Sequence, residues 1–297
     1  MRVAAVDLGT NSTRLLVADA NGTLEEVVRR LAITRLGEGV DERGKLLPVP
    51  IARVRNVLVD YRREAEALGA ERILCIATSA VRDAENGEAF LGEIEWSYGF
   101  TTRLLSGEEE AALTLRGVGA ADPGTLVVDI GGGSTEVQVV GTDVRESLDV
   151  GCVRLTERFG EDVAAIRAHV RALLPEARPA DAIGVAGTVT TLAALDLGLE
   201  EYDPARIHGH VLARAAVEEQ LARLAGLGVE ARAELMEPGR ASVIVAGAAI
   251  LVEVLDAYGL DAIRASERDI LHGAALAAAE LPAPEEGAAP PGAYTCC

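Results

Sequence analysis

The sequence has few aromatic residues, few basic residues and few cysteines. Aromatic side chains make up 3% of the 297 residues and hydrophobic ones 49%, so the core must be packed with aliphatic side chains. The 28 basic and 47 acidic side chains give a formal net charge of −19. This balance excludes broad binding of nucleic acid or anionic lipid, because both need basic surfaces.

Long apolar runs and paired cysteines are also absent. The four cysteines, at positions 75, 152, 296 and 297, form no CxxC pair, which favours a reducing compartment. The N-terminus reads MRVAAVDLGTNS and reaches Asp7 too soon for a secretory leader. The longest apolar run, 243–252, is shorter than the roughly 20 residues of a membrane-spanning helix. We therefore expect a cytoplasmic protein with no membrane contact.

Strand-like apolar runs alternate with segments of helical periodicity, which predicts an α/β fold. The strand-like runs are 3–6, 15–18, 72–77, 126–129, 137–140 and 183–186. One helix is predicted over 51–68, ending at Gly69, and a buried one over about 240–258, ending at Gly259. The composition of 282–297 predicts a disordered tail.

The most informative feature is an internal repeat. At an offset of 122, residues 6–14 (VDLGTNSTR) align with residues 128–136 (VDIGGGSTE), and the Asp, Gly and Ser positions coincide. A repeat on this scale predicts two related lobes, 1–121 and 122–281, with a cleft between them.

Each copy of the repeat predicts a turn that binds phosphate. Glycine allows backbone N–H groups to approach an anion closely, and Ser or Thr hydroxyls add donors. An ordinary glycine-rich β-turn is the alternative for the second copy taken alone. The presence of two copies in register favours phosphate binding.

Strand alternation distinguishes the faces of the second copy. Ser134, Glu136 and Gln138 share one face of the predicted strand. Together with Asp129, Glu136 offers hard oxygen ligands suited to Mg²⁺. Arg14 occupies the corresponding place in the first copy and would present a cation to phosphate. A simple ion pair between Arg14 and Glu136 is the alternative.

Three further segments carry candidate residues. In SGEEEA (106–111), Ser106 and Glu109 fit a helix capping box, which leaves Glu110 as a candidate base for activating water. Arg82, after the strand at 72–77, is either a phosphate ligand or a surface arginine at the strand end. Thr188, in AGTVTT, lies near a predicted helix N-terminus, where it binds an anion or caps the helix.

The motifs in combination resemble the exopolyphosphatase and guanosine pentaphosphate phosphohydrolase (Ppx/GppA) family. The matching segments are VDLGTNSTRLL (6–16), ITRLGEGVD (33–41), IATSAVRDAEN (76–86), SGEEEA (106–111), VVDIGGGSTEV (127–137), AGTVTTLAAL (186–195) and RASVIVAGAAIL (240–251). The resemblance implies two RNase-H-like lobes of the actin and sugar-kinase type, with the last helix, about 269–281, packing back on the first lobe. It also implies Mg²⁺-dependent hydrolysis of terminal phosphoanhydrides, with Mn²⁺ as an alternative metal, and a homodimer.

The resemblance also implies roles for individual residues. Glu110 corresponds to the catalytic base, Arg82 to a second catalytic residue near the phosphate loop of the first lobe, and Asp129 and Glu136 to the metal-binding acids. The phosphate ligands would be Asp7, Thr10, Asn11, Ser12, Arg14, Gly131, Gly132, Gly133, Ser134, Gly187 and Thr188. His272 departs from the family, in which many members have arginine, and these residues include no counterpart of the helical C-terminal region of longer members.

The function predicted from the sequence is release of terminal phosphate from inorganic polyphosphate, with a preference for short chains. The alternative substrate is guanosine pentaphosphate, which the same chemistry would hydrolyse. A regulator that binds guanosine polyphosphates without hydrolysing them is the alternative from another class. A sugar or acetate kinase fits the motif SGEEEA poorly.

Overall fold

The computed structural model describes residues 1–282, so the expected tail lies outside the described residues except for its first position. The chain divides into two compact units. Unit 1 combines Met1–Gly117 with the residues from Ile270 onward, and unit 2 is Val118–Asp269. The sequence-based boundary lies a few residues later, at 121/122.

Unit 1 contains one mixed sheet in the order β3-β2-β1-β4-β5. Its strands are β1 (Arg2–Leu8), β2 (Ser12–Ala20), β3 (Leu24–Ile33), β4 (Arg72–Ala77) and β5 (Thr101–Leu104). The first three form an antiparallel meander, and β4 and β5 run parallel to β1. The helices are α1 (Val40–Arg43), α2 (Pro48–Ala67), α3 (Ser79–Arg82), α4 (Gly87–Tyr98), α5 (Gly107–Val118) and α13 (Ile270–Ala279).

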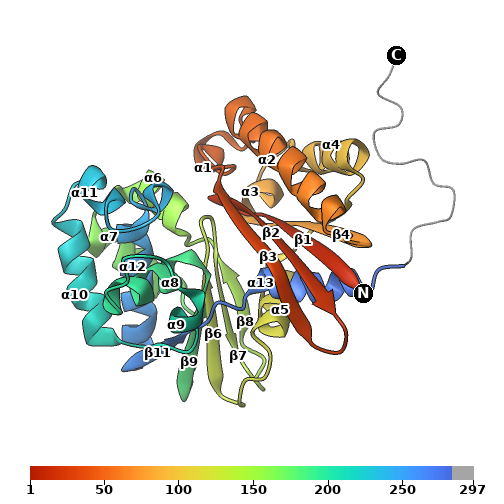
Figure 1. Cartoon of the computed structure of the whole chain (residues 1–297). Helices are drawn as coiled ribbons and strands as arrows, with labels where there is room; N and C mark the ends of the chain where they lie inside the picture. Colours follow the sequence, from red (N-terminus) through yellow and green to blue (C-terminus); the bar gives the residue numbers. More distant parts are fainter. Residues whose placement is uncertain (283–297) are drawn as a thin grey trace, which may run out of the picture. The chain divides into compact units, whose positions relative to one another are not determined.

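Alternating side chains of β1 pack into two separate cores of unit 1. Ala4, Val6 and Leu8 lie with α2 and α4, whereas Val3 and Ala5 lie with α13. Figure 1 shows α2 and α4 on one face of this sheet and α13 on the other. Helix α13, from the end of the described chain, thereby completes a core that begins at the N-terminus.

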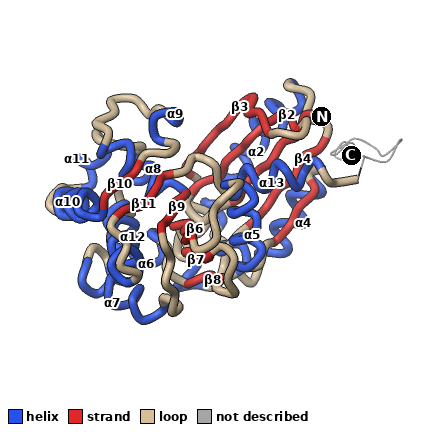
Figure 2. Tube along the Cα trace, turned by 90° about the horizontal axis from the view of Figure 1, so that it is seen from below, coloured by secondary structure: helices blue, strands red, loops and turns tan. Residues whose placement is uncertain are grey.

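Unit 2 repeats this topology. Its sheet has the order β10-β11-β9-β6-β7-β8, so β6, β7, β8, β9 and β11 follow the arrangement of β1 to β5 (Figure 2). The strands are β6 (Thr125–Ile130), β7 (Thr135–Val139), β8 (Arg145–Leu148), β9 (Asp181–Val185), β10 (Val211–Ala213) and β11 (Ala262–Ala265). The helices are α6 (Cys152–Phe159), α7 (Val163–Leu173), α8 (Ala186–Asp196), α9 (Pro204–Ile207), α10 (Arg214–Ala225), α11 (Val229–Ala233), the 3₁₀ turn η1 (Pro238–Arg240) and α12 (Ile244–Ala257). The predicted α/β class, with two mixed sheets in two lobes, is confirmed.

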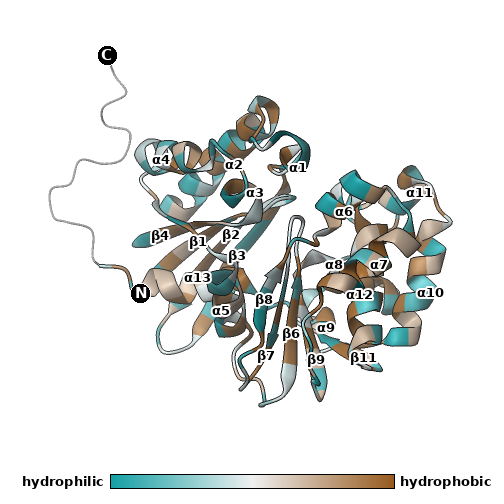
Figure 3. Cartoon of the chain, turned by 180° about the vertical axis from the view of Figure 1, so that it is seen from behind, coloured by the Kyte–Doolittle hydropathy of each residue, from teal (hydrophilic) through white to brown (hydrophobic). Residues whose placement is uncertain are grey.

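Helix α12 is the centre of the unit 2 core. All its residues from Ile244 to Leu255 are buried, as its sequence predicts, and Figure 3 shows it as a largely apolar helix. It begins later than the predicted position because Pro238–Arg240 forms a separate 3₁₀ turn. Helix α2, in contrast, begins earlier than predicted, because Pro48 and Pro50 lie inside its first turn. The N–H groups of a first turn have no partner within the helix, so proline is tolerated there.

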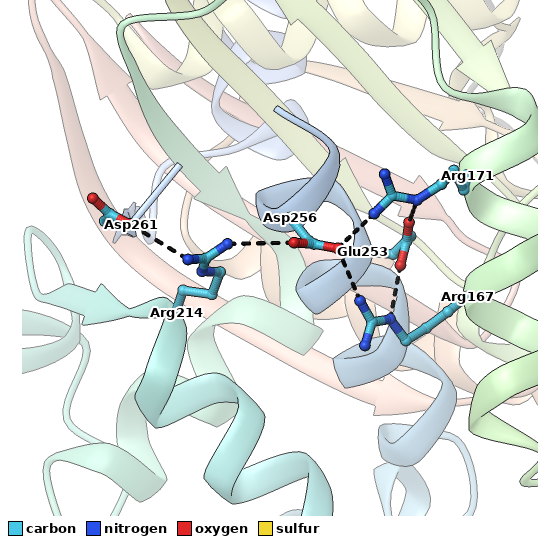
Figure 4. A network of polar contacts seen from close by, with 6 residues as sticks. All are labelled: Arg167, Arg171, Arg214, Glu253, Asp256 and Asp261. Atoms are coloured by element: carbon cyan, nitrogen blue, oxygen red, sulfur yellow. Dashed lines mark hydrogen bonds and ion pairs between the residues drawn. The ribbon is translucent and has the colours of Figure 1, made fainter. Parts of the chain in front are cut away.

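A network of ion pairs ties three helices of unit 2 together (Figure 4). The network consists of Arg167 and Arg171 on α7, Glu253 and Asp256 on α12, Arg214 on α10, and Asp261. Glu253 is almost fully buried and accepts hydrogen bonds from both α7 arginines.

Within the described part of the chain, no helix is both long and apolar enough to span a bilayer.

Candidate functional site

The two copies of the repeat form hairpins with the same register. Asp7 lies opposite Arg14 on β1 and β2, and Asp129 lies opposite Glu136 on β6 and β7. In both turns a glycine N–H donates to the serine carbonyl three residues later, at 3.0 Å from Gly9 to Ser12 and at 3.0 Å from Gly131 to Ser134. The sequence repeat therefore corresponds to two hairpins with the same strand register and the same hydrogen bond across the turn.

In unit 1 the segment after β3 binds the carbonyls of the turn. The N–H of Gly37 donates to Thr10 O at 2.8 Å, and Asn11 O accepts from Thr34 and Arg35 at 3.1 and 2.9 Å. A Cβ on Gly37 would lie 2.2 Å from the Thr10 methyl carbon. The motif ITRLGEGVD thus holds the hairpin, and glycine permits the contact.

In unit 2 the first turn of α6 performs the same task. Cys152 N donates to Gly131 O at 2.9 Å, and Val153 N donates to Gly132 O at 2.8 Å. A Cβ on Gly151, directly before α6, would lie 2.2 Å from Gly132 O. The glycines that pack on the two hairpins, Gly37 and Gly151, therefore face corresponding turn positions.

The carbonyls bound in this way determine where the turn amides point. A peptide unit is planar and trans, so its C=O and the following N–H point in opposite directions. Fixing Gly131 O and Gly132 O against α6 directs the N–H groups of Gly132 and Gly133 away from that helix. Successive N–H groups directed to one side form a concave anion-binding surface.

Opposite charges meet at the base of the unit 1 hairpin. Arg14 donates to Asp7 Oδ2 from Nε at 2.9 Å and from Nη2 at 2.6 Å. The Asp7 residue is 3% exposed. The sequence-predicted set Asp7, Thr10, Asn11, Ser12 and Arg14 is thus brought together in one turn, with Arg14 anchored by a charge-assisted contact.

Two carboxylates meet at the corresponding place in unit 2. Asp129 and Glu136 are 8% and 5% exposed, and Ser147 Oγ donates to Glu136 Oε1 at 2.7 Å. Val128 and Val137 lie in the core, so Asp129 and Glu136 share the opposite face, as strand alternation predicts. Two carboxylates on one face of a hairpin provide hard oxygen ligands of the kind that Mg²⁺ prefers. The pair therefore fits Mg²⁺, which commonly binds a protein through only one or two carboxylates. Residues 1–282 contain no group of three or more acidic, histidine or cysteine side chains that could hold a metal ion.

Glu110 and Arg82 form an ion pair in unit 1. Glu110 is 4% exposed on the first turn of α5, and Arg82 Nη1 donates to its Oε1 and, at 2.9 Å, to Leu105 O. The neighbouring capping box is present: Ser106 N donates to Glu109 Oε2 at 2.8 Å and Glu109 N to Ser106 Oγ at 3.2 Å. The Ser106 N–H lowers the pKa of Glu109. Glu109 thus has a structural role, as predicted, while Glu110 is held by an arginine.

Gly187 and Thr188 lie in the first turn of α8, in unit 2. Thr188 is not the helix cap, because α8 begins at Ala186, which has a positive φ of 64°. A Cβ on Gly187 would lie 1.2 Å from Arg240 Nη1, so this guanidinium lies directly on the glycine. Arg240 adds a cation that the residue-by-residue prediction missed; its proximity to Gly187 depends on the fold.

Two cysteines and one histidine are buried within the units. Cys75 and Cys152 are buried free thiols, and burial raises the pKa of Cys152 to about 11. His272 is buried on α13, and its Nε2 lies 2.8 Å from Glu26 Oε1 on β3. The departure from the family at position 272 thus contributes to packing of unit 1.

Comparisons with known proteins extend over both units. The sequence pattern of the Ppx/GppA phosphatase family matches residues 15–280. Exopolyphosphatase 2 of Mycobacterium tuberculosis is 40% identical over 94% of this chain and 98% of that protein. The crystal structure of an exopolyphosphatase-like protein is 32% identical, with a TM-score of 0.84 over 92% of this chain and 97% of its own. A PPX-GPPA enzyme of Aquifex aeolicus is 31% identical, with a TM-score of 0.78 over 93% and 99% of the two chains.

Proposed function

Because the chain belongs to the Ppx/GppA phosphatase family, we propose that it releases terminal phosphate from inorganic polyphosphate. Family membership confirms the sequence-based expectation of a phosphoanhydride hydrolase. The observation that carries the choice of substrate is the match to an exopolyphosphatase over nearly the full length of both chains.

The proposed base is Glu110. A water molecule attacks the terminal phosphorus, the bond from phosphorus to the bridging oxygen breaks, and the carboxylate accepts a proton from the water. General-base assistance of this kind typically contributes a factor of about 10²–10⁴. Arg82 holds the carboxylate through its ion pair, which fixes the direction in which Glu110 can accept that proton.

The predicted turn residues would bind the phosphate chain, apart from Asp7, whose carboxylate is ion-paired with Arg14. The turn amides and Arg14 of unit 1 and the turn amides, Gly187 and Thr188 of unit 2 provide donors for phosphate oxygens. Stabilising charge on the transferred group is the main protein contribution to phosphoryl transfer. Asp129 and Glu136 would hold Mg²⁺ or Mn²⁺, which when bound neutralises charge on phosphate oxygens.

The acidic surface supports a preference for short chains. Backbone amides and a few arginines bind phosphate locally, whatever the net charge. With a formal charge of −19, however, the rest of the molecule repels the distal part of a long polyanion. The preference should weaken at high salt, which screens repulsion between exposed charges.

The test is phosphate release by the purified protein with Mg²⁺ on short polyphosphate, long polyphosphate and guanosine pentaphosphate in one assay. We expect the highest kcat/KM on short polyphosphate. Faster turnover of guanosine pentaphosphate would move the assignment to the nucleotide substrate. Equal or better turnover of chains of several hundred phosphates would contradict the length preference.

The role of Glu110 is tested with Glu110→Gln, which keeps the shape and removes the base. We expect kcat to fall about 10²–10⁴-fold with little change in KM. Glu108→Gln, at an exposed position in the same helical turn, is the matched control and should retain full activity. Full activity of Glu110→Gln would remove the base assignment.

A further inference from the structure

The two hairpins differ in how the third carbonyl of the turn is held. In unit 1 this carbonyl, Asn11 O, accepts two backbone N–H groups. The corresponding carbonyl in unit 2, Gly133 O, accepts from a side chain: Arg154 Nε donates to it at 2.7 Å. One replaceable side chain thus occupies the place of two main-chain donors.

Arg154 is well placed to fix this carbonyl. It lies in the first turn of α6, where its own N–H donates to Gly132 O at 3.1 Å. Its side chain is 12% exposed, and its Nη2 lies 3.7 Å from Asp149, whose side chain is 74% exposed. The main chain and the side chain of one residue therefore hold two successive peptides of the glycine turn.

We propose that Arg154 is a positioning residue for the phosphate-binding turn of unit 2. The Gly133 carbonyl and the Ser134 N–H belong to one planar peptide, so fixing the oxygen fixes the direction of the N–H. Arg154 draws the oxygen toward α6 and directs the Ser134 N–H to the opposite side, as a donor to a substrate phosphate oxygen. The inference rests on the proposed phosphatase function and deepens it.

The test compares Arg154→Met, Arg154→Lys and Arg158→Met in the full chain. Arg158 lies one turn later on α6 and is exposed, so its replacement removes the same charge and serves as the control. We expect Arg154→Met to raise KM for short polyphosphate about tenfold or more, because a hydrogen bond to a charged group contributes about tenfold or more to affinity. Arg154→Lys should recover part of the loss, and Arg158→Met should match the wild type. An unchanged KM in folded Arg154→Met would overturn the proposal, since a merely structural role lowers thermal stability and the active fraction but leaves KM unchanged.

A second measurement uses the wild-type protein and does not depend on activity. The Arg154 Nε–H should exchange with solvent at least tenfold more slowly than an arginine in an unstructured peptide, as observed by NMR of the guanidinium groups. Exchange at the unstructured rate would overturn the inference even if the enzyme is active. An inactive wild type with a protected Nε–H would instead contradict the proposed function and leave the contact itself established.

Discussion

The hairpins of units 1 and 2 share a backbone but not a charge pattern. Both place an aspartate opposite the residue seven positions later, and both close the turn through a glycine N–H and a serine carbonyl. In unit 1 the partner of the aspartate is Arg14, and the pair is neutral overall. In unit 2 the partner is Glu136, and the pair has two negative charges when ionised.

The difference in charge assigns different roles to the two proposed phosphate-binding turns. The turn amides suit phosphate in both units, because the backbone geometry is the same. In the proposed function the cross-strand pair decides which cation contacts phosphate: in unit 1 it would be the Arg14 guanidinium, whose charge Asp7 balances, whereas in unit 2 it would be a divalent cation held by Asp129 and Glu136.

Among the hairpin variants, the largest loss of activity is expected for Glu136→Gln. The change retains the Ser147 contact but removes one of two hard oxygen ligands, so kcat/KM should fall about 10³-fold at fixed Mg²⁺. The Mg²⁺ concentration needed for half-maximal rate should rise, as measured by a metal titration of phosphate release. Glu146→Gln, on the adjacent strand β8 and exposed, is the control. An unchanged metal requirement in Glu136→Gln would remove Glu136 from the metal site.

A smaller loss of activity is expected for Arg14→Gln. The loss of one charged phosphate ligand should lower kcat/KM about 10²-fold and leave the Mg²⁺ requirement unchanged. The variant also leaves Asp7 buried without this guanidinium, which should cost about 3–5 kcal/mol in unfolding free energy. The double variant Asp7→Asn/Arg14→Gln should regain stability but not activity. A shifted Mg²⁺ requirement in Arg14→Gln would contradict the separation between phosphate binding by Arg14 and metal binding by Glu136.

The glycines that pack on the turns should show a graded effect. In Gly151→Ala the new Cβ would meet backbone, Gly132 O, which cannot move aside, whereas in Gly37→Ala it would meet the Thr10 methyl group. We expect losses of about 3 and 1–2 kcal/mol, respectively, in chemical denaturation. In Gly92→Ala, on α4, the new Cβ would meet no atom within 4 Å beyond its chain neighbours and the backbone of its own helix, so this control should be neutral or slightly stabilising. Equal losses of unfolding free energy in Gly37→Ala and Gly151→Ala would contradict this difference, because they would mean that the Gly132 backbone moves aside as readily as the Thr10 methyl group.

The smallest effect concerns the capping box beside the proposed base. The folded-state pKa of Glu109 is lowered, so its contribution to stability is present above its unfolded pKa and is lost as pH falls through the folded value. Glu109→Ala should therefore cost up to about 1 kcal/mol at pH 7, and the difference from wild type should vanish in acid. Unfolding curves at pH 7 and below pH 4 measure this. Equal costs at both pH values would mean that the carboxylate charge is irrelevant to the cap.

The hairpins and the capping box could be predicted from the sequence because they are local. The aspartate, glycine and serine positions of a turn, or the serine and glutamate of a cap, lie within a few residues of each other. Strand alternation likewise placed Glu136 correctly on the face opposite the core. The buried strands β1, β4 and β6 were found from their apolar runs.

The contacts that hold the turns could not be found in this way. Gly37 and Gly151 pack on the turns, and Arg240 packs on Gly187 of α8, through close approaches between separate segments, which leave no periodic signal in the sequence. Strand β3 was missed for another reason: it is an edge strand with charged, partly exposed side chains, so it lacks an apolar run. The interdomain cleft, the homodimer and the roles of the site residues stay predictions.

Metal binding without substrate distinguishes the two hairpins, because only the carboxylate pair of unit 2 is proposed to hold a divalent cation. Calorimetric titration with Mn²⁺ should give the same affinity for the wild type and Arg14→Gln, and an affinity at least tenfold weaker for Glu136→Gln. Equal affinities in all three proteins, or equal weakening in both variants, would contradict the claim.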